Sequence, residues 1–237
     1  MAENLTPGDS PSLVSSALDA ARQGLSAWNI SGDARLLKRL GNFTYEADAN
    51  GQGYIIRVTE PSHRPIPQLE AELDWLMFLD GKGIPVSAPL PAARGTLVET
   101  FQTEEGSFHV SVFKKAPGRR FDFDQDWDAA FHRRLGELAG GMHSATQTYT
   151  PADHILPRES WADDMSRTEQ FIPRDETAAL KEFDVVMEWA SGLKIDADTY
   201  GLVHTDLNYN NLFVGDRGKL TVFDFDDCRY HWFAYDI

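Results

Sequence analysis

Residues 201–227 gather the polar side chains whose types and spacing could support chemistry. The stretch reads GLVHTDLNYNNLFVGDRGKLTVFDFDD and contains Asp206, Asn211 and Asp224. Two short apolar runs separated by Gly-Asp-Arg-Gly predict a hairpin that returns Asp224 to the side of Asn211. Their carboxylate and amide oxygens would form the oxygen-only kind of site that Mg²⁺ prefers. Asp206 would then remain to position a hydroxyl group.

The pattern H-x-D-x-x-x-x-N, followed by an Asp-bearing turn, is that of the protein-kinase catalytic loop. Here it begins at His204. An HxD followed by an Asn also occurs by chance, and FDFDD could be the solvated acidic end of a strand. The combination of motif, apolar hairpin and returning aspartate favours a functional site over these alternatives.

The same stretch resembles the aminoglycoside phosphotransferase and choline kinase superfamily more than ordinary protein kinases. Members of that superfamily read H-G-D-L-H-P-G-N, then I-D-F/W-D/E-D, then P-x-x-Y-D-L. This chain reads HTDLNYNN, FDFDDC and FAYDI, the last of which contains Asp236. Thr205 and Asn210 replace glycines, and Asn208 replaces a histidine. Asn tolerates a left-handed backbone, whereas Thr205 is the larger departure and bears on substrate preference rather than on chemistry.

The resemblance covers residues 34–236 and implies an ATP- and Mg²⁺-dependent phosphotransferase. Its acceptor would be a hydroxyl of a small molecule such as an aminoglycoside or an amino alcohol. By resemblance, Asp206 would orient and help deprotonate that hydroxyl, and Asn211 and Asp224 would hold Mg²⁺ against the phosphates. Catalysis in such sites is chiefly positioning and charge neutralisation.

Residues 53–90 carry the second part of the resemblance. Arg57 lies in the predicted strand YIIRV, and Glu72 lies in an amphipathic helix predicted over 65–81. Arg57 could be an ordinary outward-facing strand residue, and Glu70 competes with Glu72, but a guanidinium can grip phosphate oxygens bidentately. By resemblance, Arg57 would hold the α- and β-phosphates of the nucleotide and Glu72 would hold Arg57.

Composition narrows the classes of protein. The chain has 237 residues, 42% hydrophobic, with a formal net charge of −15. A chain of this length and hydrophobic content can build a core. Its negative net charge disfavours binding to nucleic acid, whose phosphates require a basic face. Cys228 is the only cysteine, which favours a reducing compartment such as the cytoplasm. The polar N-terminus and the short apolar runs predict neither a signal peptide nor a membrane span.

The order of elements predicts an α+β, bilobal, protein-kinase-like fold. Residues 1–33 would be a loose tail and a helix capped by Ser12. Residues 34–114 would form a nucleotide-binding lobe, an antiparallel sheet of five strands with one main helix. Residues 115–237 would form a mainly helical lobe that follows a hinge at Pro117–Gly118 and carries the catalytic loop.

The second lobe is expected to be incomplete. Helices are predicted over 127–146, 161–171 and 175–194, with His143 as a packing residue. The last helix is expected to turn six side chains inward: Leu180, Phe183, Val186, Met187, Ala190 and Leu193. Members of the superfamily usually continue with more helices, so we expect a truncated chain with an exposed apolar surface through which it could associate. The oligomeric state stays open.

Two other functions remain open at this point. The chain could be a kinase that phosphorylates proteins, or a non-catalytic, nucleotide-binding module with a kinase-like fold. The intact Asp206, Asn211 and Asp224 argue against decay of the motif. They do not argue against loss of the acceptor pocket.

Overall fold

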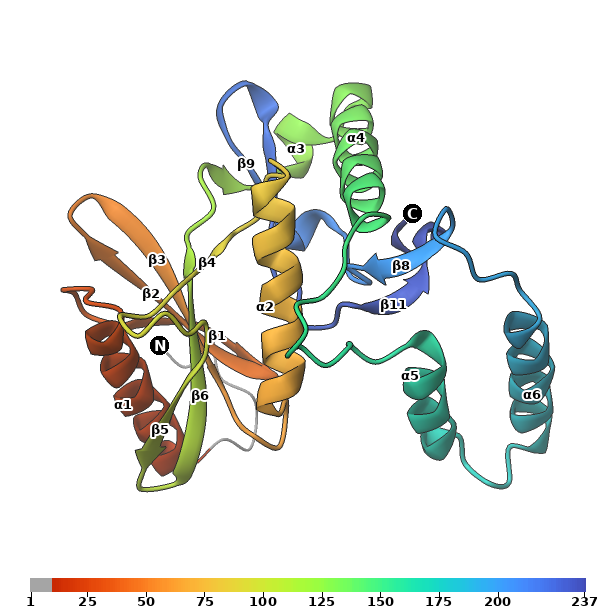
Figure 1. Cartoon of the computed structure of the whole chain (residues 1–237), viewed down its shortest axis with the longest axis horizontal. Coiled ribbons are helices and arrows are strands. Elements are labelled where there is room, and N and C mark those ends of the chain that lie inside the picture. Colours follow the sequence, from red (N-terminus) through yellow and green to blue (C-terminus); the bar gives the residue numbers. More distant parts are fainter. Residues whose placement is uncertain (1–9) are drawn as a thin grey trace.

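The structure is a computed structural model that describes residues 10–237, in which two lobes are joined through one crossing of the chain (Figure 1). Most of the loose tail predicted at the start of residues 1–33 therefore lies outside the described residues. The helix that follows is α1 (Pro11–Ala27), and its cap is Ser10 rather than Ser12. The Ser10 Oγ atom accepts from the Leu13 N–H at 3.1 Å, and Pro11 is suited to the first helical position.

The first lobe is built on a six-stranded antiparallel sheet in the order β1-β2-β3-β6-β4, with β5 paired to β6. The strands are β1 (Arg35–Leu40), β2 (Asn42–Ala49), β3 (Gln52–Thr59), β4 (Pro89–Leu90), β5 (Glu99–Thr103) and β6 (Gly106–Lys114). The structure has the five predicted strands. The sixth, β4, has only two residues, too few for any periodic pattern in the sequence to reveal it.

Two helices cover opposite faces of this sheet, α1 on one side and α2 (Ile66–Gly81) on the other (Figure 1). Alternation along β3 decides which side chains meet which helix. Ile56 and Val58 are buried in the cluster beneath α1. Arg57 points the other way, towards Glu72 of α2. The period of two therefore places one basic side chain on the face of the sheet that α2 covers.

The second lobe contains four helices, four 3₁₀ turns and five short strands among its described residues. The helices are α3 (Phe123–Asp126), α4 (Ala129–Thr146), α5 (Trp161–Thr168) and α6 (Thr177–Ser191), with 3₁₀ turns η2 (Glu169–Phe171), η3 (Tyr209–Asn211), η4 (Asp216–Gly218) and η5 (Phe233–Asp236). The strands are β7 (Arg119–Arg120), β8 (Tyr200–Val203), β9 (Leu212–Val214), β10 (Leu220–Val222) and β11 (Arg229–Trp232). The predicted hairpin is β9–β10, to which β7 adds a third strand, while β8 pairs with β11.

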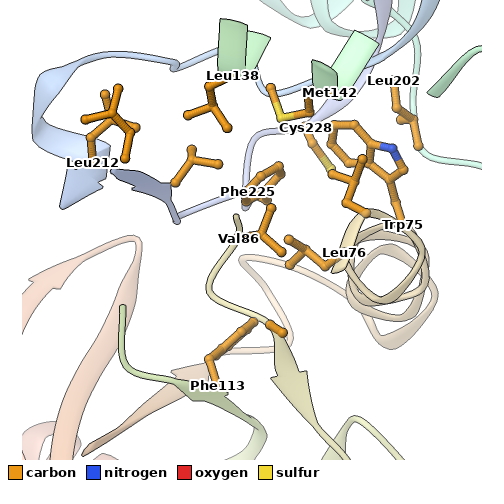
Figure 2. Close-up of a cluster of buried hydrophobic side chains, with 14 of the residues drawn as sticks. Trp75, Leu76, Val86, Phe113, Leu138, Met142, Leu202, Leu212, Phe225 and Cys228 are labelled. Atoms are coloured by element: carbon orange, nitrogen blue, oxygen red, sulfur yellow. The ribbon is translucent and has the colours of Figure 1, made fainter. Parts of the chain in front are cut away.

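The lobes share one apolar cluster, centred on Phe225 of the FDFDD turn (Figure 2). Phe225 packs edge-on against Trp75 of α2, with ring centroids 5.4 Å apart. Figure 2 shows Val86 on the first-lobe side of Phe225 and Met142 of α4 on the other side. Because these side chains are closely packed, the turn that carries Asp224 is anchored to both lobes.

Helix α6 stands apart from the rest of the second lobe (Figure 1), whereas α5 packs against β11 through Trp161 and Trp232, whose ring centroids are 5.1 Å apart. The helix predicted over 175–194 forms, but the prediction that it turns an apolar face inward is wrong. Ala190 is its only buried residue, and Val186 and Trp189 are 55% and 66% exposed. Helical periodicity identifies an apolar face without identifying what covers it. Across residues 10–237, no helix has the length and hydropathy required to cross a membrane.

Candidate active site

A cavity of about 670 Å³ lies between the lobes and brings together residues from both. Arg57 and Glu72 line it from β3 and α2, and Asn211 and Asp224 line it from the second lobe. Four of the five predicted site residues thus share one cavity. Asp206, the fifth, lies outside its lining, at an exposed position on the catalytic loop.

The catalytic loop holds both carboxylate oxygens of Asp206. Asn211 Nδ2 donates to Asp206 Oδ2 at 2.7 Å, and Asn208 Nδ2 donates to Asp206 Oδ1 at 2.6 Å. The Phe223 N–H donates to the Asn211 carbonyl at 3.0 Å, which places the end of the β9–β10 hairpin beside the loop. The predicted return of Asp224 to the side of Asn211 is confirmed by this contact.

Two site residues other than glycine have a left-handed backbone, Thr205 with φ of 70° and Asp224 with φ of 67°. A β-branched residue is strained in this region and persists only where its surroundings hold it. Thr205 donates its N–H to Asp236 Oδ1 at 2.7 Å and its hydroxyl to the Asp227 carbonyl at 3.0 Å. Asn210, the other replaced glycine, does not need the left-handed tolerance that its type offers.

Asp236 is the acceptor that fixes the start of the catalytic loop. Its Oδ2 atom accepts from the His204 N–H and from His143 Nε2, both at 3.0 Å, and its side chain is fully buried. Burial would raise the pKa of this carboxyl. The hydrogen bonds from His143, His204 and Thr205 outweigh burial and hold the pKa below its ordinary value. His143 therefore acts in this contact as a partner of a buried carboxylate.

Arg57 and Glu72 form a buried, bidentate ion pair. Arg57 Nη1 and Nη2 donate to the two Glu72 carboxylate oxygens, each at 2.7 Å, and the Glu72 side chain is 0% exposed. Burial alone would lower the pKa of Arg57, but the adjacent Glu72 raises it above its ordinary value. The structure thus pairs Arg57 with Glu72 rather than with Glu70. The forked face of the guanidinium is used by Glu72, so it cannot also grip phosphate bidentately.

The crossing between the lobes runs close to β9 at Gly118, where the sequence predicts a hinge. Gly118 has φ of 99°, and a Cβ atom there would lie 2.3 Å from the Val214 carbonyl oxygen. Only glycine fits this approach. Ala116 and Gly118 line the cavity together with apolar side chains of both lobes: Leu37, Ile55, Phe113, Phe213 and Phe223. The cavity therefore offers apolar lining as well as charged groups.

Comparison with known proteins identifies the arrangement. Residues 34–237 match the Phosphotransferase enzyme family. This chain belongs to that family. Amicoumacin kinase of Bacillus subtilis (strain 168) is 36% identical over 220 residues, which cover 92% of this chain and 64% of the relative. The chain spans less than two thirds of the length of the curated relatives that it matches.

Two solved kinase structures are similar to this chain over most of its length. An amicoumacin kinase in complex with AMP-PNP, Ca²⁺ and Ami has a TM-score of 0.80 and 35% identity, covering 86% of this chain and 61% of that chain. A microcompartment-associated aminopropanol kinase has a TM-score of 0.74 and 27% identity, covering 92% of this chain and 72% of that chain. The predicted kinase-like fold is confirmed.

The family's metal position can be tested on the donors that are present. Asn211 Nδ2 donates to the carbonyl and to Oδ2 of Asp206, and among the described residues Asn211 Oδ1 accepts no hydrogen bond. Asp224 lines the same cavity. No cluster of three or more His, Cys, Asp or Glu residues forms a metal site in the described chain. Mg²⁺ typically takes one or two protein oxygens and completes its shell with phosphates and water. Asn211 and Asp224 fit that requirement.

Sequence reasoning missed a group of charges around the FDFDD turn. His63 Nε2 contacts Asp226 Oδ2 at 2.9 Å, and Arg64 Nη2 donates to Asp227 Oδ1 at 2.6 Å. Buried Arg158 donates to the carbonyls of Asp226, Cys228 and Gln68, at 2.6, 2.7 and 3.0 Å. These contacts tie the turn to α2 and to the segment before it. The acidic run FDFDD was the only signal in the sequence, and it does not reveal its partners.

Burial would raise the pKa of the Asp226 carboxyl. The hydrogen bond to His63 and the charges of Arg57 and Arg64 overcome it and hold that pKa well below its ordinary range. Asp226 Oδ1 and Arg57 Nε are buried and have no hydrogen-bond partner among the described residues. Asp226 is therefore a second carboxylate beside Arg57, with its nearest oxygen 3.9 Å from Arg57 Nη1.

Asp236 gives a test of how the loop is held. We expect Asp236→Asn to lower the free energy of unfolding by about 1–3 kcal/mol at neutral pH, because its amide nitrogen would face N–H donors. The depressed folded-state pKa means that the wild-type carboxylate stabilises the fold above its ordinary pKa of about 4 and loses this effect as the pH falls through the folded value. Urea unfolding should therefore show the difference between the two proteins shrinking below about pH 4.

The matched control for that series is Asp153→Asn, which changes an exposed aspartate. It should leave the free energy of unfolding within about 0.5 kcal/mol of wild type at every pH. A wild-type-like stability for Asp236→Asn at neutral pH would contradict the role given to Asp236.

Proposed function

We propose that this chain is the nucleotide-binding and catalytic part of an ATP- and Mg²⁺-dependent phosphotransferase that acts on a hydroxyl of a small molecule. One observation carries the proposal. The Asp206–Asn211 loop, the Asp224 turn and the Arg57–Glu72 pair converge from separate segments at one cavity between the lobes. Such a constellation has little use in a purely structural protein, because it concentrates charges and backbone strain in one place.

In this proposal each residue has a separate task. Asp206, held on both oxygens, accepts the proton of the acceptor hydroxyl and directs that oxygen towards the terminal phosphate. Asn211 and Asp224 hold Mg²⁺, which supplies charge neutralisation of the phosphates when bound. Arg57 presents its remaining N–H groups to the phosphates and Glu72 fixes its position. Residues 34–114 would thus supply the nucleotide lobe and residues 115–237 the catalytic lobe.

The relatives support the class of acceptor. Their names give amicoumacin and aminopropanol as the molecules with which these kinases act, and one structure was solved with AMP-PNP and Ca²⁺. A nucleotide with a divalent cation, and a small acceptor, are the corresponding proposals for this chain. Its free cysteine, Cys228, is buried, and we place the protein in the cytoplasm, where ATP is available and thiols stay reduced.

The Arg57 assignment predicts a loss that depends on the phosphates. Arg57→Ala alone would leave Glu72 as an unpaired buried charge and destabilise the fold. The better variant is Arg57→Met combined with Glu72→Gln. We expect it to bind ATP about tenfold to a hundredfold more weakly, the effect of one charge-assisted contact, and to bind adenosine as wild type does. Calorimetry with both ligands, and Glu72→Gln as the control, would measure this. Equal losses for ATP and adenosine would mean that Arg57 is structural.

The catalytic assignment predicts that chemistry and binding separate. Asp206→Asn should lower the rate of phosphate transfer by about 10²–10⁴-fold, the usual contribution of a general base, while the Kd for Mg·ATP changes little. The matched control is Asp216→Asn, which makes the same charge change on the η4 turn outside the cavity.

Labelled ATP offered with a panel of amino alcohols, aminoglycosides and Ser-containing peptides measures transfer and separates the three candidate functions. Transfer to peptides alone would favour a protein kinase. Nucleotide binding with no transfer to any acceptor would favour a non-catalytic module. Full transfer by Asp206→Asn would contradict the role of Asp206.

A further inference from the structure

A basic side chain crosses the cavity from the first lobe to the FDFDD turn. Lys38, from β1 in the first lobe, places its Nζ atom 2.7 Å from Asp224 Oδ2 in the second lobe. Both side chains line the cavity, and they are 45% and 31% exposed. The ammonium therefore contacts the carboxylate that is proposed to hold Mg²⁺.

The backbone of β1 is irregular at this position. The β1–β2 register runs from Leu36 opposite Tyr45 directly to Lys38 opposite Thr44, so Leu37 is an extra residue in the strand. Consecutive strand residues normally point to opposite faces, yet Leu37 and Lys38 both line the cavity. A bulge re-aims side chains in this way and is frequent beside active sites. The lysine thus reaches the cavity because the strand is interrupted there.

The Lys38–Asp224 contact contributes little to the stability of the fold. β1 is the edge strand of the sheet, where lysines are commonly solvated. A pair as exposed as Lys38–Asp224 contributes little to stability in water, because solvent screens the charges. Asp224 moreover has the strained φ of 67°. A contact that adds little stability but joins the lobes at the proposed metal position is better explained by ligand binding.

The negative charges of nucleotide phosphates would favour a second basic side chain beside Arg57 in the cavity. Arg57, the other basic side chain near Asp224, already donates from both terminal nitrogens to Glu72. Three other basic residues of the cavity, Lys115, Arg119 and Arg120, come from the crossing between the lobes. Lys115 pairs with Glu46 at 3.0 Å and Arg119 with Asp126 at 2.6 Å, while Arg120 is exposed and has no ion pair among the described residues. Lys38 differs from them because its partner, Asp224, is itself proposed to bind Mg²⁺.

We infer that Lys38 is a second phosphate-binding residue of this site. In the nucleotide-free protein its ammonium neutralises Asp224. When a divalent cation takes the Asp224 oxygens, the ammonium is released from that carboxylate and donates to the phosphates of the nucleotide beside it. This inference rests on the proposed function, since it assumes that the cavity binds a nucleotide with its metal. It adds a residue of β1 to the predicted set of Arg57, Glu72, Asn211 and Asp224.

The inference predicts two effects of opposite sign for Lys38→Met. ATP should bind about tenfold more weakly in the presence of Mg²⁺, because one charge-assisted contact is lost, while adenosine binds as in wild type. In the absence of nucleotide, Mn²⁺ should bind about threefold more tightly, because no ammonium competes for Asp224. Calorimetry measures the first effect and water-proton relaxation by Mn²⁺ the second. If Lys38 were merely structural, its replacement would weaken the binding of both ATP and Mn²⁺ or of neither.

Two control variants complete the experiment. Lys38→Arg keeps the charge and should retain most of the ATP affinity. Lys82→Met removes the same charge at the exposed end of α2, away from the cavity, and should change neither affinity. Unchanged ATP affinity in Lys38→Met would overturn the phosphate contact, and unchanged Mn²⁺ affinity would overturn the competition for Asp224. If wild type bound no ATP at all, the proposed function itself would fail, which is a different result from either of these.

Discussion

The buried ion pair between Arg57 and Glu72 is the constraint on which the rest of the site depends. A guanidinium and a carboxylate can both be buried here only because each nitrogen of the fork meets one oxygen. The pair thus joins α2 to the face of the sheet from which Arg57 points. Trp75, one turn further along α2, then packs against Phe225 of the second lobe. The pair thereby relates the sheet to the turn that carries Asp224.

A second buried carboxylate, Asp236, plays the corresponding part for the catalytic loop. It accepts two consecutive backbone N–H groups, those of His204 and Thr205, and so maintains a left-handed Thr205 where the superfamily has glycine. The strain is offset by the hydrogen bonds that Thr205 donates from its N–H and its hydroxyl. A threonine at this position is therefore compatible with the same loop geometry. Both halves of the site thus rely on a buried carboxylate whose two oxygens both accept hydrogen bonds.

The sequence was informative where the signal is local. The HxDxxxxN spacing, the Gly-bearing hairpin and the alternation in YIIRV placed Asp206, Asn211, Asp224 and Arg57 on the correct elements, because each depends on a few neighbouring residues. It was uninformative where contacts are distant in the chain. The Lys38–Asp224 and Arg158–Asp226 contacts join segments 186 and 68 residues apart. The prediction that α6 turns an apolar face inward failed for the same reason, since a periodic pattern does not identify the segment that would cover it.

The central claim is that Asn211 and Asp224 hold the divalent cation of a bound nucleotide, and calorimetry of ATP binding with and without Mg²⁺ tests it most directly. Wild type should bind ATP more tightly when Mg²⁺ is present. Asp224→Ala should lose that dependence on Mg²⁺ while still unfolding cooperatively, and Asp227→Ala, which removes a neighbouring carboxylate paired with Arg64, should keep it. An Asp224→Ala protein with the Mg·ATP affinity of wild type would contradict the account.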